Sequence, residues 1–152
     1  MTTDAPNATA NAYLRTKVMS ASPEELRLLL LEGGLRFARI GREGLAEKNY
    51  EKAFENIIKS KDIVLELINI LRPDVDPELC SKLSALYTYV YQRLTDANMT
   101  HETAPADEAI TLLEYERETW VMLMDQLKAE RDAGAPPVET PAQPTARLSV
   151  EG

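Results

Sequence analysis

The stretch that decides the fold is residues 22–47, SPEELRLLLLEGGLRFARIGREGLAE. It opens like a helix, because Ser22 can cap the first turn, Pro23 suits the first helical position and Glu25 can bond back to the cap. Apolar residues then recur every three or four positions, which is typical of an amphipathic helix. We therefore expect a helix from Pro23 to about Glu47.

Four glycines interrupt this expected helix in or beside its apolar stripe. Each costs about 1 kcal/mol of helix propensity relative to alanine, so something must compensate for them. Close approach of a neighbouring helix is the expected compensation, and a helix that is merely weak and frayed is the alternative. The four are Gly33, Gly34, Gly41 and Gly44.

Three further segments show the same helical periodicity, and no stretch alternates apolar and polar residues as a strand does. Asn49 and Asp76 stand where the first two of these helices need a cap. Prolines stop the second helix of the chain beyond about residue 71. The expected ranges are 50–71, 77–98 and a last helix within 105–131.

Short connections between long helices favour antiparallel neighbours. We therefore expect an all-α chain folded as an antiparallel up-down four-helix bundle with disordered termini. Residues 1–12 are small and polar, and residues 132–152 are rich in Pro, Ala and Thr with few large apolar groups. The expected organisation is a disordered N-terminus over 1–12, a folded domain over 13–131 and a disordered Pro-rich tail over 132–152.

Composition excludes several classes of function. Seventeen basic and twenty-five acidic residues give a net charge of −8, and no local basic stripe offsets it, so we expect no nucleic-acid partner. No apolar run approaches the roughly 18 residues of a spanning helix, and the first residues lack the order of a secretory signal. We expect no membrane insertion and a cytoplasmic location.

The chain offers little for catalysis. A single cysteine, Cys80, cannot form an internal disulfide, and a single histidine, His101, cannot complete a zinc cluster with it. No Gly-rich phosphate loop is present. We expect no catalytic residue, no metal and no cofactor. A signalling adaptor or phosphotransfer-like domain acting through His101 is the alternative, although its neighbours Thr100 and Glu102 are not the basic residues that a phosphohistidine needs.

Large apolar side chains also fall away from each expected core stripe. Leu28 and Leu35 do so on the first expected helix, and Ile63 and Ile70 lie opposite a stripe that contains Phe54 on the second. A bundle buries one face per helix, so the surplus indicates a groove for an amphipathic partner helix. Scattered surface and a homodimer contact are the alternatives. Further residues of this kind are Tyr89 on the third helix and Tyr115 and Met122 on the fourth.

Four motifs stand in order along most of the expected folded region. They are YLRTKVMSASPEEL at 13–26, EGGLRF at 32–37, LSALYTYVYQRLTDAN at 83–98 and Trp120. Together they resemble the FliS family of flagellar secretion chaperones. The resemblance implies a four-helix bundle that binds the disordered C-terminal segment of flagellin in the cytoplasm, prevents premature polymerisation and assists delivery to the flagellar export gate.

The same resemblance implies how the client binds, and the residues that we expect it to contact come from the backs of the helices. The client of this family is extended and partly helical and wraps around the bundle. Tyr13 and Val18 would then form an N-terminal plug over part of the client site, the alternative being a hydrophobic staple ahead of Ser22. A homodimer is possible when the client is absent. The expected client-binding residues are Ile63, Leu67, Ile70, Tyr89, Arg93, Tyr115 and Met122.

Overall fold

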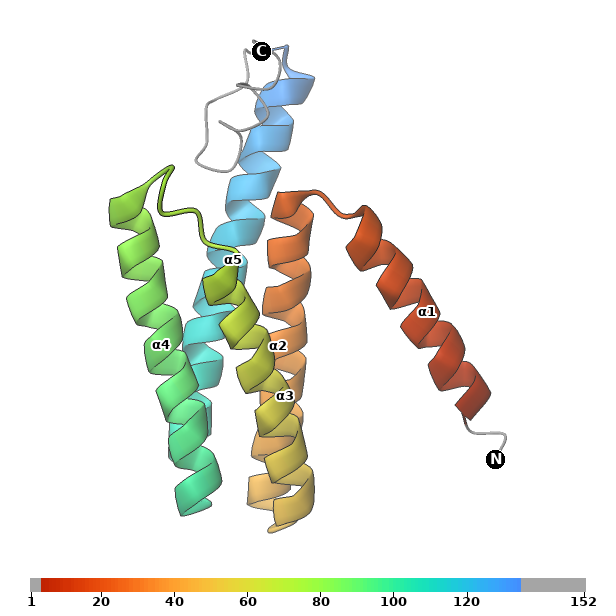
Figure 1. Cartoon of the computed structure of the whole chain (residues 1–152), viewed down its shortest axis with the longest axis vertical. Coiled ribbons are helices and arrows are strands. Elements are labelled where there is room, and N and C mark those ends of the chain that lie inside the picture. Colours follow the sequence, from red (N-terminus) through yellow and green to blue (C-terminus); the bar gives the residue numbers. More distant parts are fainter. Residues whose placement is uncertain (1–3, 135–152) are drawn as a thin grey trace.

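The computed structural model describes residues 4–134, with side chains from residue 8 onward, and every regular element in that range is a helix (Figure 1). The all-α prediction is confirmed, but the described part of the chain contains five helices rather than four. They are α1 (Asp4–Ser20), α2 (Pro23–Ala46), α3 (Tyr50–Asn69), α4 (Pro77–Thr100) and α5 (Thr103–Asp132).

The start of α2 confirms the capping prediction. The Ser22 hydroxyl accepts a hydrogen bond from the backbone N–H of Glu25 at 3.2 Å, and the Ser22 N–H donates to the Glu25 carboxylate at 3.2 Å. These bonds hold the pKa of Glu25 below its usual value. Two of the unpaired donors at the helix start are thereby satisfied.

The other helix starts also follow local capping chemistry. The Asn49 side chain accepts from the Lys52 N–H at 3.2 Å at the start of α3, and Asp76 accepts from the Leu79 N–H at 3.1 Å at the start of α4. Both caps were predicted. The α5 helix begins at Thr103, slightly before the expected range, which places Pro105 in the first turn where its missing N–H costs nothing.

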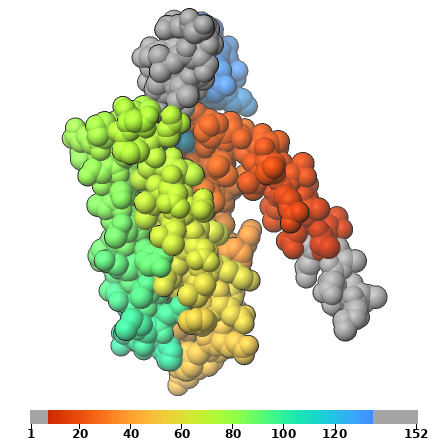
Figure 2. Space-filling model, in the orientation of Figure 1, coloured from red at the N-terminus to blue at the C-terminus, as the bar shows by residue number. Residues whose placement is uncertain are grey.

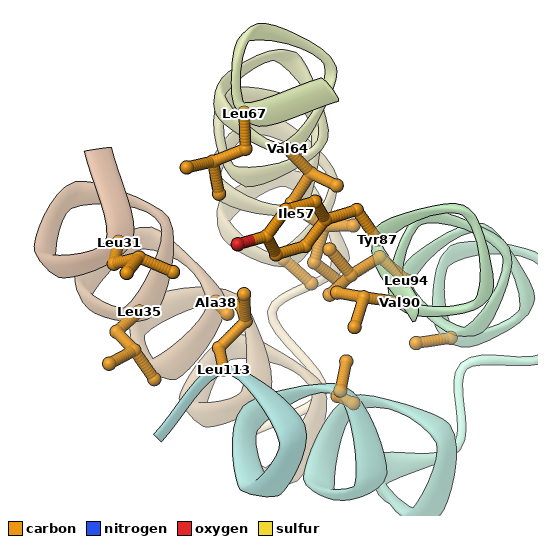
Figure 3. Packing of buried hydrophobic residues seen from close by; sticks show 14 of the residues in the cluster. Leu31, Leu35, Ala38, Ile57, Val64, Leu67, Tyr87, Val90, Leu94 and Leu113 are labelled. Carbon is orange, nitrogen blue, oxygen red and sulfur yellow. The ribbon is translucent and has the colours of Figure 1, made fainter. Parts of the chain in front are cut away.

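Helices α2 to α5 surround one core. Each packs against two others, with α2 beside α3 and α5, and α4 beside α3 and α5. Successive members of the set run antiparallel (Figure 1). Figure 3 shows the large buried side chains meeting between these four helices. The buried apolar residues are Leu31, Leu35, Ala38, Leu45, Ala53, Ile57, Val64, Leu67, Tyr87, Val90, Leu94, Ala97, Ala106, Ala109 and Leu113.

The predicted close approach at the glycines is confirmed between α2 and α3. A Cβ added at Gly44 would lie 2.7 Å from the backbone nitrogen of Ala53, and one at Gly41 would lie 2.6 Å from the Ile57 side chain. Only glycine lets the two backbones come this near. Leu35, expected on the back of this helix, is buried in the core instead.

The segment before α2 differs from the expectation of a disordered stretch over residues 1–12. Residues 4–20 form α1, whose alanines at 8, 10 and 12 have high helix propensity. Figures 1 and 2 show α1 extending away from the packed helices. Most of the expected tail, from residue 135 on, lies outside the described residues, whereas its first residue, Asp132, belongs to the end of α5.

Candidate partner-binding surface

Three of the expected client-binding residues lie on α3 or at its end, and the structure turns them inward. Leu67 is 0% exposed and belongs to the core, so its assignment to a binding surface is corrected. Ile63 is half-buried, and its Cδ1 would lie 3.3 Å from a Cβ at Gly33 of α2. Ile70, the residue that ends α3, is also half-buried. The α3 side that was expected to face solvent therefore faces α2 and the core.

The misplacement comes from the choice of core stripe. The prediction centred α3 on its large apolar residues, which included Phe54, but Phe54 is 58% exposed. The buried side instead contains Ala53 and Ser60, and the Ser60 hydroxyl donates to the Gly34 carbonyl at 2.8 Å. Small residues mark the face where α3 meets α2 most closely.

The opposite side of α3 carries apolar residues that the sequence reasoning missed as a surface. Lys61 points toward α4, where its Nζ lies 4.7 Å from the centroid of the Tyr91 ring. Phe54 and Leu65 lie seven residues before and four residues after Lys61, so helical geometry puts them on the same side. Leu65 is 41% exposed. We call Phe54, Ile58, Lys61, Leu65 and Tyr91 the α3–α4 strip.

The α4 border of this strip is polar but uncharged. Three short polar residues share the side of α4 on which Tyr91 lies. They are Ser84 and Thr88, seven and three residues before Tyr91, and Thr95, four residues after it. The Thr95 hydroxyl donates to the Tyr91 carbonyl at 3.0 Å, which satisfies it within the helix. Short, uncharged side chains beside exposed apolar ones cost less to desolvate than charged side chains would.

Tyr89 and Arg93 lie on the other side of α4 and connect it to α5. The Tyr89 hydroxyl donates to Glu108 Oε1 at 2.7 Å, and the Arg93 Nε lies 2.7 Å from the same oxygen. Arg93 also donates to Asp96 at 3.0 Å. The hydrogen bond to Glu108 raises the pKa of Tyr89. The polar ends of both side chains are therefore engaged within the chain.

Tyr115 and Met122 are 66% and 71% exposed on α5. They follow Glu108 at intervals of seven residues, so the three residues share one side of the helix. That side is the one on which Glu108 contacts Tyr89. The structure thus brings Tyr89, Tyr115 and Met122 to one surface, which we call the α4–α5 strip.

The seam between α2 and α5 has a different character. Three ion pairs cross it, namely Arg42 with Asp107 at 2.8 Å, Arg39 with Glu114 at 2.6 Å and Arg117 with Glu32 at 3.4 Å. A shallow open recess there is lined by Glu32, Leu35, Arg39 and Arg117. Because its charged groups already have partners, this seam offers little to an apolar ligand.

The N-terminal residues expected to form a plug do not cover either strip in this structure. Tyr13 and Val18 are both exposed on α1. The residue that directly precedes the Ser22 cap is Ala21, whose N–H bonds to the Val18 carbonyl at 3.3 Å. The plug stays a prediction.

His101 and Cys80 have structural positions. His101 ends α4 with a left-handed backbone (φ 61°), and its ring stacks on Tyr50 with centroids 4.0 Å apart. This position gives the phosphotransfer alternative no support. Cys80 is a free thiol and is half-buried on α4. Across the described residues no three His, Cys, Asp or Glu side chains are grouped to hold a metal ion, and no helix there is long and apolar enough to cross a membrane.

Comparisons with known proteins agree with the residue patterns. The family model described as flagellar protein FliS matches residues 5–127. The flagellar secretion chaperone FliS of Bacillus subtilis is 31% identical over 120 residues, covering 79% of this chain and 89% of that protein. The Campylobacter jejuni chaperone of the same name is 30% identical and covers 75% and 89%. That of Escherichia coli is 29% identical and covers 74% and 84%. The chain therefore belongs to the FliS family of flagellar secretion chaperones.

Proposed function

We propose that this protein binds the disordered C-terminal segment of flagellin in the cytoplasm, prevents its premature polymerisation and assists its delivery to the flagellar export gate. Membership of the FliS family supports a flagellar client. The observation that carries the proposal is the α3–α4 strip, where Phe54 and Leu65 stay exposed although the core beneath them is closed.

The spacing within the strip suits a helical partner. Its α3 members stand at 54, 58, 61 and 65, the i, i+4, i+7 and i+11 positions of one helix face. An amphipathic helix laid along α3 and α4 would place its own apolar residues against them at the same spacing. A client that folds on binding gives up part of its interaction energy to ordering, so a broad surface serves it better than a small pocket.

The α4–α5 strip gives the client a second contact on the far side of α4. Tyr89, Tyr115 and Met122 supply its apolar surface, and Arg93 borders it. A segment that crosses α4 would cover both strips. In this proposal α1 can fold back from its extended position, and Tyr13 and Val18 then cover part of this surface when the client is absent.

The experiment that tests the proposal replaces Phe54 and Leu65 together by Asp. Both side chains are exposed, so the helical circular-dichroism signal should stay unchanged. Calorimetry with the C-terminal segment of flagellin from the same bacterium should show binding weakened by about tenfold or more, because two anchors lose their apolar contact. The matched control is Arg36→Asp at an exposed position of α2, which changes the net charge by the same two units outside both strips and α1 and should not weaken binding.

Two results would count against the proposal. Unchanged affinity in the folded Phe54→Asp, Leu65→Asp variant would remove the α3–α4 strip from the client site. Failure of the unaltered protein to bind the flagellin segment would remove the client itself. Light scattering over a concentration range tests the remaining use of the strip, a homodimer, for which the proposal expects a monomer at concentrations where the client binds.

A further inference from the structure

We infer that the α3–α4 strip selects a partner helix with a basic edge, because its two borders differ in charge. The basic edge of the partner then lies beside α3. The inference rests on the proposed function, since it concerns the same surface, and it adds the chemistry and direction of the partner. It follows from the charges that lie on either side of the apolar residues.

The α3 border of the strip is acidic. Three acidic residues share the side of α3 on which Ile58 lies, and all three side chains are exposed. They are Glu51 and Glu55, seven and three residues before Ile58, and Asp62, four residues after it. Glu66 follows directly after Leu65 and is exposed as well. Among the ion pairs of the described residues, none involves any of these four carboxylates.

The basic residues of α3 contact groups other than these four carboxylates. Lys52 lies on the α2 side, where its Nζ contacts Glu43 at 2.8 Å and Glu47 at 3.1 Å. Lys59 lies over the Phe37 ring of α2 at 5.4 Å. Lys61 lies over Tyr91. The acidic border therefore keeps a negative charge that the neighbouring lysines do not pair with directly.

The α4 border carries no such charge. Ser84, Thr88 and Thr95 accept either sign of side chain, or none, beside them. A partner helix with Lys or Arg along one edge gains from the α3 carboxylates, and a helix with acidic edges is repelled by them. Exposed pairs of this kind contribute little one at a time, and several acting together discriminate by about tenfold at low salt.

This asymmetry also sets the direction of the partner. A helix that lies along the strip with its apolar face inward exchanges its two edges when its direction is reversed. A helix with only one basic edge can place that edge beside α3 in only one of the two directions. The position of the basic edge in the partner sequence thus decides which end lies near Phe54 and which near Leu65.

The test uses synthetic helical peptides that share one apolar stripe and differ in having Lys or Glu along one edge. Calorimetry with the full chain at low salt should show the Lys-edged peptide binding about tenfold more tightly. Replacing Glu55→Lys and Asp62→Lys leaves two carboxylates beside two lysines on this border and should abolish that preference. The control Glu102→Lys with Asp132→Lys makes the same change of net charge at exposed positions outside both strips and should leave the preference intact.

Direction is tested with two Lys-edged peptides that carry the lysines on opposite edges and a nitroxide label at the N-terminus. Nuclear magnetic resonance of the labelled complex should show amide broadening near Phe54 with one peptide and near Leu65 with the other. Broadening at the same end with both peptides would overturn the inference.

Binding of the flagellin segment, measured alongside, separates this inference from the proposed function. Suppose that the protein binds flagellin but binds the Lys-edged and Glu-edged peptides equally well, or binds neither peptide. Either result would overturn the inference and leave the proposed function standing. A preference for the Lys edge that the control variant also abolishes would overturn it too, since net charge would then explain the effect. A Lys-edge preference without flagellin binding would support the inference and reject flagellin as the client.

Discussion

The two sides of α3 are built in opposite ways. Toward α2, Gly44 admits the backbone of Ala53, and the Ser60 hydroxyl bonds to a main-chain carbonyl, so the surfaces close on each other. Toward α4, Phe54 and Leu65 remain exposed beside short polar side chains. Stability is concentrated on the first side, and the second side keeps apolar surface that the fold itself does not use.

The largest expected effect compares two leucines that stand two residues apart on α3. Leu67→Ala should lower the free energy of unfolding by about 3 kcal/mol, because a fully buried side chain leaves a cavity. Leu65→Ala, on the open side, should cost about 0.5 kcal/mol or less, as exposed substitutions usually do. Urea unfolding followed by circular dichroism measures both, and similar losses in the two variants would erase the distinction between the sides.

A second comparison uses glycines of α2. Gly44→Ala should destabilise the protein by about 2 kcal/mol, because the new Cβ would meet backbone atoms of Ala53 at 2.7 and 3.0 Å. At Gly33 the nearest atom is the end of the flexible Ile63 side chain at 3.3 Å. Gly33→Ala should therefore be neutral or stabilising by up to about 1 kcal/mol through helix propensity. A thermal melt that ranks the two variants in reverse would contradict the close α2–α3 contact.

Substitution of Lys61, the positively charged residue of the α3–α4 strip, should have a smaller effect on stability and on peptide affinity. Lys61→Met keeps the apolar stem and removes the ammonium group that lies over Tyr91. The lost cation–π contact should cost about 0.5 kcal/mol, while affinity for a Lys-edged peptide should rise about twofold as a like charge disappears. Calorimetry and unfolding on the same variant check both signs, and weaker peptide binding would place Lys61 in favourable contact with the partner.

The smallest effect concerns pH on the closed side of α3. The hydrogen bond and charge of Lys52 hold the pKa of Glu43 below its usual 4.5, and the carboxylates of Glu43 and Glu47 raise the pKa of Lys52. A lowered carboxyl pKa stabilises the fold above pH 4.5 and loses that contribution as pH falls through the folded value. Lys52→Met should melt slightly below the unaltered protein at pH 7, and the difference should shrink below pH 4. An equal difference at pH 3 and pH 7 would show that Lys52 acts through its packing.

Helix starts could be predicted from the sequence because capping is local. Ser22, Asn49 and Asp76 each bond to a backbone N–H three residues later, and neighbouring residues are enough to recognise the pattern. The rotation of each helix could not be predicted in the same way. It depends on Ala53 and Ser60 packing against glycines of α2, which are distant in the sequence. This close packing decides which face of α3 is buried, although Phe54 is the larger apolar residue.

The candidate surface shows the same division. Tyr115 and Met122 are exposed on α5, as expected from their positions away from the core stripe, and Leu113 of the same helix is buried. Leu67 was misplaced because α3 was rotated toward Phe54. The strip opposite could have been found by centring the helix on Ala53 and Ser60. The α1 helix was missed because its small polar residues lack an apolar stripe, although its alanines favour helix.

We propose the α3–α4 strip as the surface on which the partner binds. The most direct measurement is a titration of the isotope-labelled protein with the flagellin C-terminal segment, followed by amide chemical shifts. If the partner binds along the strip, the largest changes should fall on residues 51–66 of α3 and 84–95 of α4. Changes centred on the α2–α5 seam around Glu32, Arg39 and Arg117, with α3 unaffected, would contradict it.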